Sequence, residues 1–162
     1  MTVPDPIQLQ PIATVIGGHI EPADDYQGGV ESIIRLNDTY PPETLRGIEE
    51  FGHLVVVWHF HRATPSDVAL HARSPRNDPR WPATGTFVHR SHRRPNQLAV
   101  SFPRLLRVSG LDLHVTDFDA VDGTPILDLA PYFAEMGPRG ELRQPAWPGE
   151  MLTDYWRAAE ER

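Results

Sequence analysis

The segment 85–96 carries the side chains of this chain that are best suited to bind an anion. It reads Gly-Thr-Phe-Val-His-Arg-Ser-His-Arg-Arg-Pro-Asn and places Arg90, Arg93 and Arg94 within five residues. A guanidinium group is a rigid fork of N–H donors that matches a carboxylate or a phosphate. The cluster follows a short β-type run and indicates a site for an anionic ligand. The alternative is a solvated basic loop, because most charged residues are simply exposed.

His59 and His61 lie two residues apart, on one face of a strand predicted for residues 53–61. That spacing allows two imidazoles to bind one metal ion. No second ligand motif is present, so a third ligand would have to come from a carboxylate or from His89, His92 or His114. We therefore predict no metal site, and expect hydrogen-bonded histidines near the edge of a sheet instead.

Four aspartates surround a predicted turn at Gly123-Thr-Pro: Asp117, Asp119, Asp122 and Asp128. Asp-Gly is a turn signal, so one interpretation is that Asp122 only caps this turn. The other is that the turn faces the arginine segment, where its carboxylates would bind ligand hydroxyls or accept a proton. The chain has neither a nucleophile-elbow serine nor a phosphate-binding loop.

The composition is that of one globular domain. The chain has 162 residues, of which 40% are apolar and 23% charged, and it contains no cysteine. No apolar run approaches the length that spans a bilayer, and the N-terminus lacks the features of a signal peptide, so we expect a cytoplasmic protein. The net charge of −7 argues against a general nucleic-acid-binding surface, although residues 71–94 hold six arginines and one acid.

Hydrophobic patterning predicts a mainly β fold, a compact barrel or sandwich with one or two helices. The expected strands cover residues 7–16, 30–36, 53–61, 84–90, 98–108, 111–118 and 125–129. The expected helices cover residues 39–51 and 149–162. A long polar loop is expected over residues 63–83, between the strands 53–61 and 84–90. The Gly-x-Gly-x-x-Gly turn of doubly wound nucleotide-binding folds is absent.

Four segments occur in the order and with the spacing of a known family. They are Leu45-Arg-Gly-Ile-Glu-Glu-Phe-Gly-His53, Val57-Trp-His-Phe-His-Arg62, the arginine segment 85–96, and Asp119-Ala-Val-Asp-Gly-Thr-Pro-Ile-Leu-Asp-Leu-Ala-Pro-Tyr132. Together they resemble the TsaA-like family, typified by the tRNA adenosine-37 N6-methyltransferases. The resemblance runs from about Ile7 to Tyr132.

The resemblance implies a small TsaA-like β-barrel over residues 1–135, followed by an extension, 136–162, whose helix packs on the barrel or on a dimer. It also implies a homodimer that binds S-adenosylmethionine and methylates the exocyclic nitrogen of threonylcarbamoyladenosine in tRNA. The cofactor-binding residues expected from it are Gly17, Gly18, His61, Arg62, Arg90, Arg94, Asn96, Val100, Asp119, Asp122, Gly123 and Thr124.

Within this set we expect Arg90 or Arg94 to hold the cofactor carboxylate, and Asp122 or His61 to act as a catalytic base. Two departures from the family bear on this. The usual Ile-Arg-Ser-Pro after the first strand is Val15-Ile-Gly-Gly18 here, and the usual Pro-Ile-Gly after Asn96 is Gln97-Leu-Ala99.

Three functions follow from these observations. The first is an S-adenosylmethionine-dependent methyltransferase acting on tRNA. The second keeps the cofactor but takes a small molecule as methyl acceptor, which the acidic surface and the altered loops favour. The third is a non-catalytic binding module, or a metal-dependent barrel enzyme built on His59 and His61.

Overall fold

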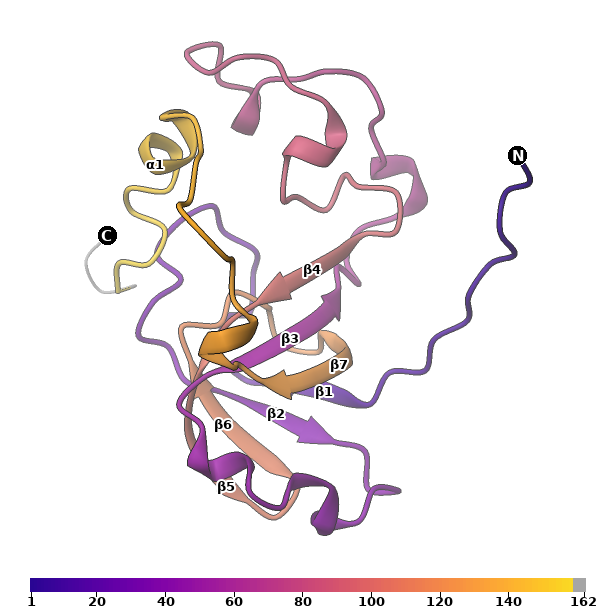
Figure 1. The fold of residues 1–162 in the computed structure, drawn as a ribbon, viewed down its shortest axis with the longest axis vertical. Helices are drawn as coiled ribbons and strands as arrows, with labels where there is room; N and C mark the ends of the chain where they lie inside the picture. Colours follow the sequence, from indigo (N-terminus) through magenta and orange to yellow (C-terminus); the bar gives the residue numbers. More distant parts are fainter. Residues whose placement is uncertain (159–162) are drawn as a thin grey trace.

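The structure, a computed structural model, describes residues 1–158 and is mainly β, as predicted (Figure 1). Seven antiparallel strands form one sheet in the order β4-β3-β7-β1-β2-β6-β5. Their bounds are β1 Ala13–Ile16, β2 Ser32–Leu36, β3 Leu54–His59, β4 Leu98–Ser101, β5 Arg104–Ser109, β6 Asp112–Thr116 and β7 Pro125–Pro131. The one α-helix of the described residues is α1, Trp147–Met151.

The sheet is not closed into a barrel, so that part of the expected fold is wrong. Strands β4 and β5 are its two edges, although they follow each other in the chain. The beginning of β5 meets the beginning of β3 at the isolated pair His53–Arg104. Because Pro103 separates β4 from β5 and has no N–H to donate, the predicted single strand 98–108 bends there and divides into two.

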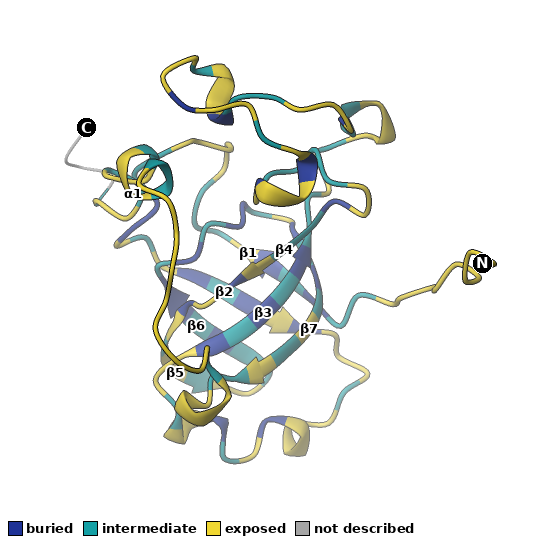
Figure 2. Cartoon of the chain, turned by 45° about the horizontal axis from the view of Figure 1, so that its top comes forward, coloured by how far each residue is buried: buried dark blue, intermediate teal, exposed yellow. Residues whose placement is uncertain are grey.

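Alternation along the strands places the core on one face of the sheet (Figure 2). In β3, Leu54, Val56 and Trp58 are buried while Val55 and Val57 are partly exposed, which confirms the period-two pattern of this segment. The neighbouring strands add fully buried residues on the same side, among them Val15, Ile34, Leu113 and Ile126. Burial of each such side chain stabilises the fold by about 1.5–3 kcal/mol.

Two predicted elements differ in the structure because proline or glycine interrupts them. The first strand begins at Ala13 rather than at residue 7, two residues after Pro11. The predicted helix 39–51 is two 3-10 turns, Pro42–Leu45 and Ile48–Glu50. Gly47 separates them at a φ of +89°, in the left-handed region that ends helices.

Two other predicted elements are shorter or different. Residues 84–90 do not form a strand; they contain the 3-10 turn Thr86–Val88 in a long excursion between β3 and β4. The predicted C-terminal helix is limited to α1, followed by turns to residue 158, and residues 159–162 of that prediction lie outside the described part.

The excursion between β3 and β4, which we call the insert (residues 60–97), stands above one end of the sheet in Figure 1. The two halves of the insert are joined by the isolated bridge Arg73–Thr84 and by the hydrogen bond from Ala69 N to Arg93 O, 3.0 Å. His89 is buried within the insert, with its Nε2 3.1 Å from Arg73 O. His89 therefore has a structural role in the insert.

We expect the effects of leucine substitutions on stability to differ according to burial. Leu54→Ala removes a side chain that is 0% exposed, whereas Leu70→Ala changes one that is 72% exposed. The first change should lower the free energy of unfolding by about 2–5 kcal/mol, because it leaves a cavity, and the second by less than about 0.5 kcal/mol. Chemical denaturation of both variants measures the difference; equal losses would contradict this description of the core.

Candidate functional site

Two loops that are far apart in the sequence are joined at the end of β1. Gly17 donates its backbone N–H to Asp122 Oδ1 at 2.7 Å, and Asp122 N donates to His19 O at 2.7 Å. A third bond runs from Gly123 N to Val15 O, 2.8 Å. We call this arrangement the glycine–aspartate turn (residues 15–19 and 119–124). Asp122 therefore fixes a turn, which agrees with the first interpretation of this residue. The same turn contains other residues predicted for the site.

Gly17 and Gly18 of this turn have a backbone conformation that favours glycine. Gly17 and Gly18 have φ values of +74° and +78°, which residues with side chains rarely adopt. A Cβ on Gly18 would also lie 2.8 Å from Ser32 Cβ, whereas a Cβ on Gly17 would meet nothing within 4 Å. The backbone at Gly17 is therefore open to a ligand. Among the described residues, the buried hydroxyl of Ser32 is the buried side-chain polar group that has no hydrogen-bond partner.

His61 lies against the same turn, with its Nε2 3.6 Å from the position of a Cβ on Gly123. Partial burial, the charge of Arg62 and the neighbouring His59 lower the pKa of His61, while Asp122 acts in the opposite direction. The imidazole is therefore neutral near pH 7 and able to accept a proton. Arg62 itself forms an exposed ion pair with Glu21, 3.0 Å.

Asp119, at the beginning of the second segment of this turn, is the centre of a second cluster. Its Oδ1 accepts a hydrogen bond from Ser101 Oγ and its Oδ2 accepts one from the Tyr155 hydroxyl, each at 2.5 Å. Ser101 Oγ in turn accepts a bond from Trp58 Nε1, 3.0 Å. The carboxylate is thus oriented by two hydroxyl groups, one from β4 and one from the C-terminal segment.

The structure separates the two arginines that were expected to bind a carboxylate. Arg94 donates Nη1 to His89 O at 2.7 Å and is partly buried inside the insert. Arg90 is exposed and uses Nη2 on Val100 O, 2.6 Å, which leaves other N–H donors of its guanidinium free. Burial and Asp119 raise the pKa of Tyr155, and the nearby charge of Arg90 counteracts them. Val100 is followed in β4 by Ser101, which binds Asp119, so Arg90 lies beside the Asp119 cluster, whereas Arg94 belongs to the framework of the insert.

Asn96 and Thr124 are two further residues of the predicted set. Asn96 is exposed in the loop before β4. Thr124 is 0% exposed and its hydroxyl donates to Val121 O at 2.7 Å, so this side chain fixes the turn. Sequence reasoning missed Ser101, Trp58 and Tyr155. Tyr155 lies in the predicted C-terminal helix, and nothing in its neighbours indicates a contact with a residue 36 positions earlier.

No three His, Cys, Asp or Glu side chains in residues 1–158 lie close enough together to hold a metal ion. His59 and His61 therefore remain a pair. The helices of the same residues include none that is long and apolar enough to cross a membrane.

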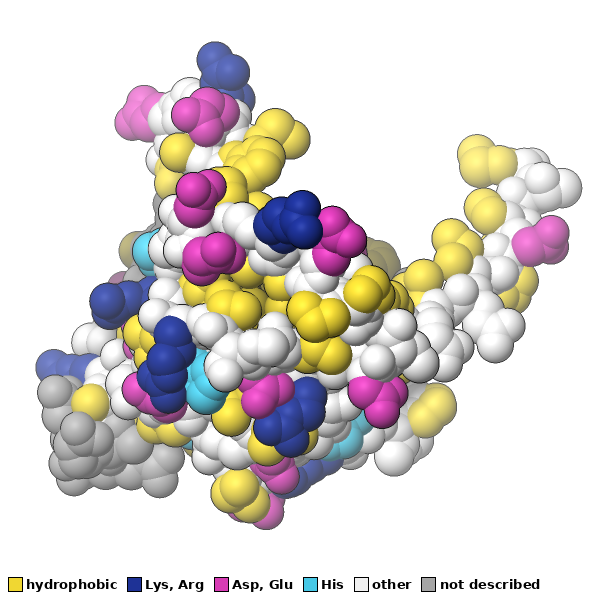
Figure 3. Space-filling view, turned by 90° about the horizontal axis from the view of Figure 1, so that it is seen from below, with side chains coloured by type: hydrophobic (Ala, Val, Ile, Leu, Met, Phe, Trp, Pro, Cys, Tyr) yellow, Lys and Arg dark blue, Asp and Glu magenta, His cyan; other side chains and the backbone are white. Residues whose placement is uncertain are grey.

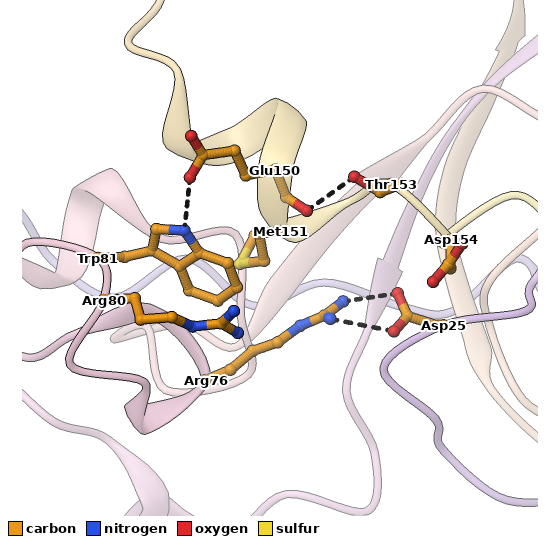
Figure 4. A pocket seen from close by; sticks show the side chains of 8 residues that line it. All are labelled: Asp25, Arg76, Arg80, Trp81, Glu150, Met151, Thr153 and Asp154. Carbon is orange, nitrogen blue, oxygen red and sulfur yellow. Dashed lines mark hydrogen bonds and ion pairs between the residues drawn. The ribbon is translucent and has the colours of Figure 1, made fainter.

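A hollow of about 360 Å³ lies beside the site, between the insert and the C-terminal segment (Figure 4). Its arginine Arg76 is already bound by Asp25, at 3.0 Å, and its Trp81 donates to Glu150 Oε2 at 2.9 Å. None of the residues expected to bind the cofactor lines it; the lining residues are Asp25, Arg76, Arg80, Trp81, Glu150, Met151, Thr153 and Asp154. We therefore place the candidate site at the glycine–aspartate turn and the Asp119 cluster.

Most arginines of the insert are engaged within the protein, in contrast to the open basic zone that the sequence indicates. Arg80 pairs with Asp78 at 2.6 Å, and Arg73 bonds to Ser91 Oγ at 3.2 Å. The opposite end of the molecule, seen from below in Figure 3, also has arginine and acidic side chains around hydrophobic ones. The insert therefore offers fewer free cations than its composition suggests.

Comparison with known proteins places the chain in a family. The tRNA-methyltransferase O N-terminal domain matches residues 22–137. A probable S-adenosyl-L-methionine-binding protein of Pyrococcus abyssi is 32% identical over 152 residues, which cover 88% of this chain and 77% of the relative. The tRNA (adenine(37)-N6)-methyltransferase of Escherichia coli is 32% identical over 130 residues, 74% of this chain but 54% of that enzyme.

The fold agrees with a solved relative. The crystal structure of TrmO from P. aeruginosa matches with a TM-score of 0.71 at 22% identity, over 90% of this chain and 63% of the other. The chain thus spans about half to two thirds of the length of these bacterial proteins. Because the family model covers well over half of the residues and includes strands β2 to β7 with His61, Arg90 and Asp119, this chain belongs to the tRNA-methyltransferase O N-terminal domain family.

Proposed function

We propose that this protein is an S-adenosylmethionine-dependent methyltransferase that acts on N6 of adenine-37 in tRNA. The observation that carries the proposal is the union of the glycine–aspartate turn, His61, Asp119 and Arg90 in one place, in a chain of this family. We further propose threonylcarbamoyladenosine as the modified base, a homodimer as the active form and the cytoplasm as its location.

The residues fit the chemical groups of the cofactor. Arg90 keeps guanidinium donors for a carboxylate, and each oxygen of Asp119 keeps an acceptor position for a ribose hydroxyl. The open backbone at Gly17 allows a flat group to approach closely. The partnerless hydroxyl of Ser32, beside Gly18, is one more polar group that a ligand in this turn could satisfy.

When bound, the cofactor supplies a methyl group on a sulfonium, which is transferred by in-line attack of the acceptor nitrogen. The role of the chain is to align donor and acceptor, which alone contributes much of the rate. The lone pair of the exocyclic nitrogen is delocalised into the adenine ring, so removal of its proton assists the attack. We propose His61 as the base, since its imidazole is neutral. Asp122 holds the turn on which this geometry depends, because its Oδ1 is bound to Gly17.

A small molecule is the second candidate for the methyl acceptor. The net charge of −7 and the internal pairing of the insert arginines favour it, because a tRNA backbone requires cations that are free to bind phosphates. The altered segment Gln97-Leu-Ala99 lies beside Val100 and Arg90, where a different acceptor would enter. Both candidates share the cofactor site.

We expect Arg90→Ala to weaken the binding of S-adenosylhomocysteine by about tenfold, because a charge-assisted hydrogen bond to a carboxylate is lost. Titration calorimetry measures the effect. Arg46→Ala is the matched control, since Arg46 is an exposed arginine that pairs with Glu43 in the turn after β2. An unchanged dissociation constant for Arg90→Ala would remove its anchoring role.

We expect kcat to rise with pH through the pKa of His61, which burial lowers from its ordinary value, and to level off above it, because only the neutral imidazole accepts a proton. His61→Gln should lower kcat by about a hundredfold and abolish this rise. Methyl transfer to tRNA that carries threonylcarbamoyladenosine but no methyl group on it, measured from about pH 5 to about pH 8, provides the data. A His61→Gln enzyme that keeps the same rise would show that another group is the base.

We expect deletion of the gene to remove a methylated adenosine nucleoside from bulk tRNA, and re-expression of the chain to restore it. Mass spectrometry of nuclease-digested tRNA measures both. Persistence of the full nucleoside profile in the deletion strain would exclude the tRNA substrate and leave the small-molecule acceptor.

A further inference from the structure

The end of the described chain is fastened to the loop between β1 and β2. Gln27 N donates to Tyr155 O at 2.7 Å, and Gly28 N donates to Arg157 O at 3.2 Å. Only glycine fits at position 28, because the Cβ of any other residue would lie 2.1 Å from Trp156 O. The close approach of two backbones defines where the C-terminal segment (residues 147–158) lies.

The same segment is fastened to the insert on its other side. Glu150 accepts the indole N–H of Trp81, a tryptophan that is only 9% exposed (Figure 4). Tyr155 lies between these two attachments. Its side chain is therefore held in place by contacts on both sides along the chain, rather than by its own hydrogen bond alone.

Tyr155 completes the hydrogen bonding of Asp119. Its hydroxyl donates to Oδ2, while Ser101 Oγ donates to Oδ1 and itself accepts from Trp58. A carboxylate has two acceptor positions on each oxygen, so one position on each remains. Two hydroxyl donors, one on each oxygen, fix the plane of the carboxylate and leave two parallel acceptor positions, which match a vicinal diol.

We propose that Tyr155 is a positioning residue of the cofactor site, and that the C-terminal segment is a wall of that site which sets its preference for a ribose diol. The inference rests on the proposed function, because it takes the diol to be that of the cofactor. Tyr155 acts through Asp119: it holds the carboxylate in the orientation in which both hydroxyls bind. A sugar that lacks one hydroxyl leaves a partly buried acceptor of this cluster unpaired.

The test compares S-adenosylhomocysteine with its 2′-deoxy analogue in titration calorimetry. We expect the wild-type protein to bind the ribose form about tenfold more tightly than the deoxy form. In Tyr155→Phe, which keeps the ring and removes the hydroxyl, this ratio should fall toward one because the ribose form alone is weakened. Tyr40→Phe is the matched control, since Tyr40 packs on the core from the turn after β2, and it should keep the ratio.

Gly28→Ala provides a second variant, which displaces the C-terminal segment and leaves Tyr155 unchanged in sequence. It should also lower the ratio, whereas Gly149→Ala, whose Cβ meets nothing within 4 Å, should not. If Tyr155→Phe weakens both ligands equally, or leaves the ratio at the wild-type value, the positioning role is wrong although the cofactor site stands. If the wild-type protein binds neither ligand, the proposed function fails and the inference fails with it.

Discussion

The hydrogen bond between the Gly17 amide and Asp122 is the constraint on which the candidate site depends. It joins the chain that leaves β1 to the chain that enters β7, 105 positions later. Strands β1 and β7 are neighbours in the sheet, with Ala13 opposite Ile126, so their adjoining loops are already close. The side chain of Asp122 then selects one arrangement of these loops, in which Gly17 stays open and His61 lies against Gly123.

The site is built from loops at the end of a rigid sheet, an arrangement common among binding and catalytic sites. Strand β3 supplies Trp58 and leads directly to His61, while β4 supplies Ser101 and the carbonyl that holds Arg90. These strands pair through Trp58 and Ala99, which sets the spacing between the histidine and the arginine sides of the site. The insert between them is long, but its ion pairs and the buried His89 make it an ordered cover rather than a basic patch.

Much of the framework could be predicted from the sequence because it follows from local pattern. The alternation in residues 54–58 identifies β3 and its buried face, and the Asp-Gly pair identifies the turn before β7. Residues 84–90 show the limit of this reasoning: their β-type composition yields a 3-10 turn, since no neighbouring strand is available to pair with them. The open sheet is a second case, because whether two edges join depends on the curvature of the whole sheet.

The candidate site was predictable only in part, for the same reason. Glycines, histidines, aspartates and arginines are visible as motifs, but their partners are not. That Arg94 binds a carbonyl of the insert while Arg90 binds the carbonyl of Val100 in β4 depends on the path of the loop. The contact of Tyr155 with Asp119 depends on Gly28, whose missing side chain admits the C-terminal segment.

A crystal structure of the protein with S-adenosylhomocysteine bound would test the central claim most directly. The account predicts that the ligand lies against Gly17, with its carboxylate at Arg90 and its ribose at Asp119. A ligand found instead in the hollow lined by Arg76, Trp81 and Glu150 would contradict it, because none of the residues assigned here to the cofactor contributes to that hollow.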